Sequence, residues 1–333
     1  MKSAEQNPLR SKKTEWVVTV PSFVWLALFF AIPSVIVLAF TFHGHTANGG
    51  VGEWGMDTWR ELVDPDYPAI VWNTLRISFL VTLWSIVLAL PCAYAIARMN
   101  TKWKNIIAGS IMLPFWTSFV VRVFAWKTML HPDGWLQSCY FVFLQVRGWL
   151  FDWLPGFLKG FLVQLGLANA GPIDPATSTI LDSEAAVILV SVYSFIPFAI
   201  MPIYTAAEKF DFSLLEAARD LGAKNFYAFR KIFIPGIKQG LISAVLMVFI
   251  PAIGSYVIPD LVGGTDSELI GNKIYQRTFP DRNLPHASAL ATVTGASVLI
   301  PLACVAWWLK RQDEREARRL AEATARKLSG GAA

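Results

Sequence analysis

The side chains in this sequence that could do chemistry are a few carboxylates and aromatic rings near the ends of apolar runs. The acidic groups belong to Asp260 and Glu268, and the rings to Trp116, Tyr193 and Tyr256. Carboxylates neutralise ammonium groups, and aromatic faces bind both cations and the methylene carbons between them. Asp260 is the leading candidate, because an ionisable group inside an apolar run is costly unless it faces a cavity or a partner. These residue types are compatible with a pathway for a cationic solute, but also with ordinary charge sorting and interface anchoring in a membrane protein.

Motifs for catalysis, nucleotide binding and metal binding are missing from the sequence. It has no G-x-x-x-x-G-K-[ST], no G-x-S-x-G and no H-E-x-x-H. The three cysteines, Cys92, Cys139 and Cys304, are far apart and have no ligand spacing. His43 and His45 could touch a metal, but two histidines in a loop are a weak ligand set. We therefore expect no enzyme activity, no cofactor and no metal site.

The composition indicates a membrane protein. Of the 333 residues, 54% are hydrophobic and only 16% are charged, and the mean hydropathy is +0.45. A soluble chain carries about a quarter charged residues, so this one lacks the polar surface to cover itself in water. Its net charge of +5 comes from short clusters between apolar runs, a pattern typical of orientation in a membrane. We expect contact with the lipid bilayer and no nucleic-acid partner.

Six apolar stretches are long enough to cross the hydrocarbon core, which takes about 20 residues of helix. The sequence predicts an all-α integral membrane protein with about six transmembrane helices. A transmembrane domain is expected over 17–309, after an N-terminal segment 1–16 and before a charged tail 310–333. The first stretch is too long for a signal peptide and should be retained. The predicted spans are about 17–42, 70–97, 106–130, 185–207, 240–262 and 288–309.

The positive charges predict the orientation of these helices. Four segments, 1–16, 98–104, 209–238 and 310–327, hold 20 of the 29 Lys and Arg residues. Short loops rich in Lys and Arg stay in the cytoplasm, so both termini and the loop 208–238 are expected there.

The segment 135–167 is apolar but interrupted by charges. As a seventh span it would place Arg147, Asp152 and Lys159 in the bilayer, at about 2.5–3.5 kcal/mol each at the centre. It would also move the positive loop 208–238 outside. We expect amphipathic helices at the outer interface instead.

The loop 208–238 has signals for a bent pair of helices. Asp211 or Ser213 can cap a first helix, with Glu216 completing a capping box, and Gly222 can end it. Four apolar residues at helical spacing would share one face of this helix; they are Leu214, Leu215, Ala218 and Leu221.

A second short helix is predicted over 225–233, with Pro235 as its stop. The small side chains of Ala217 and Ala218 would let another protein approach closely. On residue types alone, a docking element and an ordinary amphipathic loop fit equally well.

The same loop resembles a known signature. The motif Glu-Ala-Ala at 216–218, Gly222, and Ile-Phe-Ile-Pro at 232–235 are similar to the EAA motif of permeases of bacterial ATP-binding-cassette (ABC) importers, except that Ile234 replaces a leucine. The resemblance implies that this loop is a coupling helix that docks on a cytoplasmic ATPase. The residues to which it gives this role are Glu216, Ala217, Ala218, Asp220, Gly222, Ile232 and Pro235.

Further motifs between about residues 73 and 301 resemble the permeases of spermidine/putrescine importers, in particular their first permease subunit. They are Leu-Pro-Phe-Trp-Thr-Ser at 113–118 followed by Arg122, and the segments 249–254, 257–260, 263–264 and 269–272. This resemblance implies an ABC type I importer permease fold and inward movement of polyamines by alternating access. It also implies a multi-pass location in a bacterial inner membrane, a pair of ATPases, a second permease and a periplasmic binding protein.

Two alternatives stay open. An ABC importer permease for an opine, a phosphonate or ferric ion would carry the same EAA loop. An ion-coupled secondary carrier would need ionisable groups within its spans, and the apolar runs hold almost none.

Overall fold

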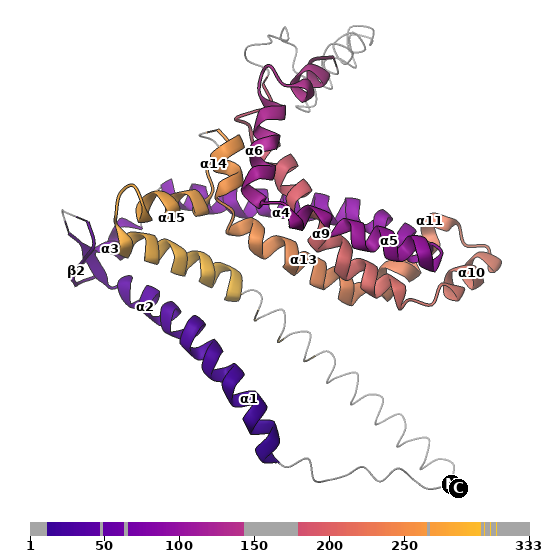
Figure 1. The fold of residues 1–333 in the computed structure, drawn as a ribbon, viewed down its shortest axis with the longest axis horizontal. Helices are drawn as coiled ribbons and strands as arrows, with labels where there is room; N and C mark the ends of the chain where they lie inside the picture. Colours follow the sequence, from indigo (N-terminus) through magenta and orange to yellow (C-terminus); the bar gives the residue numbers. More distant parts are fainter. Residues whose placement is uncertain are drawn as a thin grey trace. The chain divides into compact units, whose positions relative to one another are not determined.

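A computed structural model describes residues 12–46, 49–62, 66–142, 179–264 and 267–300, with isolated positions at 303, 307 and 311. These residues are mostly helical, as the sequence predicts (Figure 1). The chain divides into two compact units, which we describe separately. One comprises Met1–Tyr67 and Ile274–Ala333, and the other Pro68–Lys273.

The described part of the first unit starts with one long helix. Its parts follow each other directly: α1 (Lys12–Leu26), a π-helical turn η1 (Ala27–Ala31) and α2 (Ile32–Phe40). A short antiparallel hairpin of β1 (His43–His45) and β2 (Val51–Trp54) comes next, with His43 opposite Trp54. The hairpin was not predicted. α3 (Asp57–Glu61) and an apolar helix Leu284–Ile300 also belong to the described part of this unit.

The second unit carries most of the helices. They are α4 (Asp66–Ala97, which starts at the unit boundary), α5 (Thr101–Ile111), the 3-10 turn η2 (Leu113–Trp116), α6 (Phe119–Leu130), α9 (Glu184–Glu208), α10 (Ser213–Asp220), α11 (Asn225–Ala228), the π turn η3 (Phe229–Phe233), α12 (Ile234–Gly236), α13 (Lys238–Ile253), α14 (Val257–Val262) and α15 (Ile270–Thr278, which ends in the first unit).

The centre of the second unit is the pair α9 and α13, which lie side by side (Figure 1). A Cβ on Gly240 of α13 would lie 2.5 Å from the Cβ of Ala206 and 2.7 Å from the carbonyl oxygen of Pro202. The two backbones approach so closely only because residue 240 is glycine. Small residues that permit such contact are typical of helix pairs in lipid, where packing replaces the hydrophobic effect between helices.

Three described helices are long and apolar enough to cross a membrane: Thr19–Phe40, Tyr67–Ala97 and Glu184–Glu208. They correspond to the first, second and fourth predicted spans. The described residues contain five such spans if each of two bent helix pairs counts as one, and Leu284–Ile300 is a shorter apolar helix at the place of the sixth.

The third and fifth predicted spans are not continuous helices. Residues 106–130 are divided between α5 with η2 and α6, which meet at 87°, because Thr117 and Ser118 are extended between them. The fifth helix ends at Ile253, nine residues before the predicted end, and a turn at Gly254–Tyr256 separates it from α14. Each prediction treated an apolar run as one helix, although a turn at membrane depth is possible where it is buried in protein or lines a cavity.

Most of the predicted interfacial segment 135–167 lies outside the described residues. Residues 135–142 are helical, and the fully buried side chain of Gln137 accepts a hydrogen bond from the amide of Ile180 at 3.1 Å. The residues just before and just after the undescribed stretch are therefore joined. The segment 1–11 and nearly all of the tail 310–333 also lie outside the described residues.

Candidate functional site

The start of α10 is fixed by Asp211. Its Oδ1 accepts a hydrogen bond from the amide of Ser213 at 3.0 Å. Hydrogen bonds from the Ser213 hydroxyl and amide lower the pKa of the Asp211 carboxyl below its ordinary value. Of the two predicted caps, Asp211 is the one used. Ser213 is instead the first residue of α10, and Phe212 occupies the N-cap position, where no side-chain hydrogen bond forms. The predicted capping box of Ser213 and Glu216 is therefore absent.

The end of α10 is fixed by Gly222, as predicted. Its φ is +86°, a value that suits glycine and strains most other residues. The amide of Gly222 donates to the carbonyl of Arg219 at 2.8 Å, and the amide of Ala223 donates to that of Ala218 at 3.0 Å. This pair of bonds is a Schellman motif, which satisfies carbonyls at the helix end. No heavy atom lies within 4 Å of where a Cβ on Gly222 would be, so the backbone angle alone restricts this position.

Nearly all of α10 faces outward. Leu215 is its one buried residue, whereas Leu214 is half exposed and Leu221, directly after the helix, is 90% exposed. The body of the protein therefore covers only part of the predicted apolar face, burying Leu215 fully and Ala218 partly. Of the predicted ATPase-contacting residues, Glu216, Ala217, Asp220, Gly222 and Pro235 are exposed, and Ala218 and Ile232 are partly buried.

The second short helix forms where predicted but does not stop at Pro235. It continues through η3 and α12 to Gly236, and the chain then bends by 74° into α13 around Ile237. Pro235 lies in the first turn of α12, a position at which a missing N–H is tolerated. The bend therefore comes two residues after the proline.

Beneath this loop lies a group of five packed rings, which we call the aromatic cluster. The ring centroids of its contacting pairs are 5.0–6.1 Å apart, from Tyr94 and Phe233 at 5.0 Å to Phe212 and Phe233 at 6.1 Å. These distances are typical of favourable aromatic pairs. Arg98 donates to the hydroxyl of Tyr94 at 2.9 Å. The cluster joins α4 to the residues on both sides of α10, and its members are Tyr94, Phe210, Phe212, Phe229 and Phe233.

An ion pair joins α5 to the end of α9 near the same loop. The Lys104 ammonium lies 2.6 Å from Oε1 of Glu208 and 5.8 Å from the ring centre of Tyr204. The loop of α10 and α11 therefore begins at a helix end that is held in place by a neighbouring helix.

The candidate pathway residues fall at several places. Asp260 and Tyr256 are one turn apart on and before α14, because the amide of Asp260 donates to the carbonyl of Tyr256 at 3.0 Å. Both side chains are exposed, and among the described residues the Asp260 carboxylate has no hydrogen-bond or ion-pair partner. α14 contacts both α6 and α9. Asp260 and Tyr256 are thus two candidate residues that the structure brings together.

The remaining candidates are less well placed for a cation. The carboxylate of Glu268 forms an ion pair with Lys273 at 2.8 Å, so a neighbouring ammonium already neutralises it. Tyr193 packs against Trp126 of α6 with ring centres 5.2 Å apart. Trp116 is 86% exposed, in η2 just before the break to α6. Arg122, beyond that break, lies over the rings of Phe115 and Phe119 at 5.7 and 5.9 Å.

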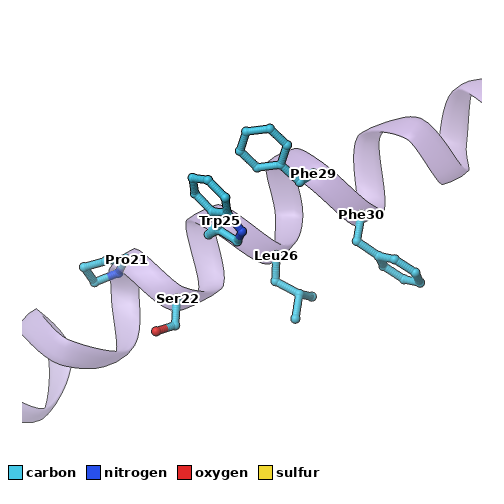
Figure 2. A pocket seen from close by; sticks show the side chains of 6 residues that line it. All are labelled: Pro21, Ser22, Trp25, Leu26, Phe29 and Phe30. Carbon is cyan, nitrogen blue, oxygen red and sulfur yellow. The ribbon is translucent and has the colours of Figure 1, made fainter. Parts of the chain in front are cut away.

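A shallow hollow on the first helix has no such polar groups. Figure 2 shows that all of its lining side chains project from one helix, and that most are apolar or aromatic. It lacks a carboxylate and therefore does not resemble a cation site. The lining residues are Pro21, Ser22, Trp25, Leu26, Phe29 and Phe30.

Comparison with protein families decides the class of this protein. The family described as "Binding-protein-dependent transport system inner membrane component" matches residues 14–318. The chain belongs to this family. It is therefore a component of a membrane transport system, and its fold is that of ABC importer permeases.

Named relatives of this permease cover most of its length. It is 33% identical to the spermidine/putrescine transport system permease protein PotB of Haemophilus influenzae, over 88% of this chain and 92% of the relative. It is 30% identical to PotB of Escherichia coli K12, over 85% and 93% of the two chains. The inner membrane ABC transporter permease protein YdcU of E. coli K12 is 31% identical over 75% of this chain and 72% of its own.

Solved structures support the same fold. A bacterial ABC transporter that imports the acidic polysaccharide alginate superposes on this permease with a TM-score of 0.54, at 16% identity, over 86% of this chain and 93% of that one. A second structure of such a transporter, in complex with an alginate pentasaccharide-bound periplasmic protein, gives a TM-score of 0.55.

The permease has functional candidates that sequence reasoning missed. The aromatic cluster is one, because Tyr94 lies more than a hundred residues before the other four members along the chain. The motif Phe-Asp-Phe at 210–212, directly after a predicted span, was the available signal. The pair of Lys104 and Glu208 is another. Its signal was a charge of each sign at the inner ends of two predicted spans.

Proposed function

We propose that this permease is one of two membrane subunits of an ATP-driven importer, and that its loop of α10 and α11 docks on a cytoplasmic ATPase. The observation that carries the proposal is that α10 is fixed at both ends yet buries only Leu215. Helices this short are unstable alone in water, and exposed apolar groups in a cluster mark interaction surfaces. The exposed side chains of Leu221, Phe226 and Tyr227 fit such a surface.

The energy for transport comes from the ATPase in this proposal. The sequence has no phosphate-binding loop of its own. In this proposal the loop and both termini lie in the cytoplasm, an orientation that the Lys- and Arg-rich segments support. A second permease completes the membrane pathway, and a periplasmic binding protein delivers the solute, as the complex of the structural neighbour suggests.

The solute of this proposal is a polyamine, carried inward. Relatives at 30–33% identity are named as spermidine/putrescine permeases. The turn of α14 offers the chemistry for such a solute, because the Asp260 carboxylate can neutralise an ammonium group and the exposed ring of Tyr256 can bind the charge or the methylenes. Permeases for opines, phosphonates or ferric ion are the other candidates within the family.

Movement between outward- and inward-facing states follows from the way the loop is built. Closure of two ATPases would pull this loop and the loop of the partner permease together. Because Asp211 and the Schellman motif fix both ends of α10, the helix would move as a rigid body and shift the helices that hold it.

Uptake into vesicles tests this proposal. The complete complex, reconstituted with its binding protein outside and ATP inside, should accumulate radiolabelled spermidine, and omission of the ATPase should abolish uptake. Uptake by this chain alone, driven by a proton or sodium gradient, would contradict the proposal and favour a secondary carrier. ATP-dependent uptake of another solute in place of spermidine would refute only the polyamine part.

A further inference from the structure

We propose that α4 transmits the movement of the α10–α11 loop (residues 208–238) to the start of α4, at the far end of the second unit. Tyr94 is the positioning residue that connects the loop to α4. This inference rests on the proposed docking of an ATPase on the loop. It names the path by which that docking would reach the turn that carries Asp260.

Tyr94 contacts both sides of the loop. Its ring centre lies 6.0 Å from that of Phe212, which precedes α10, and 5.4 and 5.0 Å from those of Phe229 and Phe233, which follow it. All three pairs are edge-to-face. One side chain of α4 is therefore held by both ends of the loop, although more than a hundred residues separate it from them.

The cluster is packed tightly enough to pass on a displacement. Arg98, one turn beyond Tyr94, donates to its hydroxyl at 2.9 Å and lies 5.7 and 5.8 Å from the ring centres of Tyr94 and Phe212. On the other side, a Cβ on Gly236 would lie 2.4 Å from Cε2 of Phe210. Close-packed groups of this kind transmit strain because they cannot be compressed.

The loop is also connected along the chain to α9, which ends at Glu208, and to α13. α10 buries only Leu215, and the chain reaches α13 through the 74° bend around Ile237. A bend can absorb movement by changing its angle, so the loop should displace α13 less than α4. The aromatic cluster packs against the side of α4 through Tyr94.

The far end of α4 is joined to the elements around Asp260. The Oγ1 of Thr74 accepts a hydrogen bond from the amide of Ile270, the first residue of α15, at 2.9 Å. Arg76 forms an ion pair with Glu184, the first residue of α9. Twenty residues of helix separate Thr74 from Tyr94, which corresponds to about 30 Å. α4 is thus one continuous element with a side-chain anchor near each end.

A second hydrogen bond leads from there to the candidate pathway. The Nδ2 of Asn272 in α15 donates to the carbonyl of Tyr256 at 3.1 Å, and that same carbonyl accepts the amide of Asp260. A shift of α4 along its axis would therefore act on the start of α15 and, through Asn272, on the turn that presents Asp260.

The test compares transport with ATP hydrolysis in the complete reconstituted complex. Tyr94→Leu removes the ring but keeps an apolar side chain. We expect ATP hydrolysis within about twofold of wild type and spermidine uptake per ATP lowered about tenfold or more, within the usual range of coupling between sites. Tyr94→Phe keeps the ring and should lose far less. Trp84→Leu, an exposed aromatic position on the same helix, is the matched control and should change neither.

Thr74→Val tests the other end of α4. It keeps the shape of the side chain but removes the acceptor for Ile270, so it should lower uptake per ATP in the same way as Tyr94→Leu. If Tyr94→Leu does not assemble, Thr74→Val and Tyr94→Phe carry the test. Wild-type coupling in Thr74→Val, or in an assembled Tyr94→Leu complex, would overturn the proposal.

A labelling measurement does not depend on the solute. Gly254 is exposed, and a Cβ there would meet no atom within 4 Å, so Gly254→Cys is a suitable reporter once native cysteines are replaced. Trapping the ATPase with vanadate should change the rate at which the cysteine of Gly254→Cys reacts with maleimide. Tyr94→Leu should remove that change. If the change persists in Tyr94→Leu, α4 is not the path. If the wild-type complex hydrolyses no ATP, the proposed function fails instead.

Discussion

The α10–α11 loop and the α14 turn differ in how their form arises. The loop is shaped by neighbours in sequence, since Asp211 caps its first helix and Gly222 ends it. The turn that presents Asp260 depends on distant residues, because Asn272 and Thr74 connect it to α15 and α4. A docking element built from local signals can keep its shape while the membrane helices move. A solute site that depends on distant contacts can change when they change.

The largest effect is expected in the α10–α11 loop, at Gly222. Gly222→Val should abolish coupling of ATP hydrolysis to uptake, because a β-branched residue at a φ of +86° costs about 1–3 kcal/mol in backbone strain. Uptake and ATPase activity of the reconstituted complex measure the outcome.

Gly222→Asn is the control for that prediction. Asparagine tolerates the left-handed region, and the space around a Cβ at this position is open. It should retain most of the coupling. Equal loss in both variants would mean that close contact with the partner, and not backbone geometry, requires glycine.

A smaller effect is expected at the α14 turn. Asp260→Asn removes the charge but keeps the shape, so spermidine uptake at low concentration should fall by about tenfold, the equivalent of about 1.4 kcal/mol. Glu268→Gln is the matched control, since Lys273 already neutralises that carboxylate, and it should change uptake much less. If the two variants behaved alike, Asp260 would have no special place in the pathway.

The smallest effect should come from the cap of α10. Asp211→Asn should leave the helix nearly intact at pH 7, because Asn caps as well as Asp. The Asp211 carboxyl has a lowered pKa, so its contribution is present above the ordinary value of 3.8 and is lost as pH falls through the lower value in the folded protein. Hydrogen exchange of α10 at pH 7 and pH 3 should therefore show more fraying at pH 3 in wild type than in Asp211→Asn. Equal fraying of wild type and Asp211→Asn at pH 3 would show that Asp211 is not the cap.

Sequence signals recovered those parts of the fold that depend on local chemistry. The apolar lengths of three spans and the helix end at Gly222 were predicted, because composition and one glycine determine them. The breaks after Trp116 and Ile253 were missed, since nothing in Thr117–Ser118 or Gly254–Ser255 distinguishes a turn from the kinks that membrane helices tolerate.

The errors at the site have the same origin. Periodicity placed Leu214, Leu215 and Leu221 on one apolar face but could not say which of them is buried, because burial depends on what lies beneath the helix; Leu215 is buried, and Leu214 and Leu221 are exposed. The contacts of Tyr94 join residues more than a hundred positions apart, which local patterns do not report. Asp260 was identified from its cost in an apolar run, whereas the pairing of Glu268 with Lys273 required the folded chain.

Site-directed crosslinking from α10 tests the docking of an ATPase most directly. Ala217→Cys, exposed on this helix, should form a crosslink to the ATPase in native membranes, and the yield should change when ATP is added. Gly254→Cys, in the turn before α14, should form none. If Ala217→Cys captures no ATPase and instead reacts with a membrane-impermeant maleimide added outside intact cells, the loop lies on the wrong side of the membrane and cannot be the docking element.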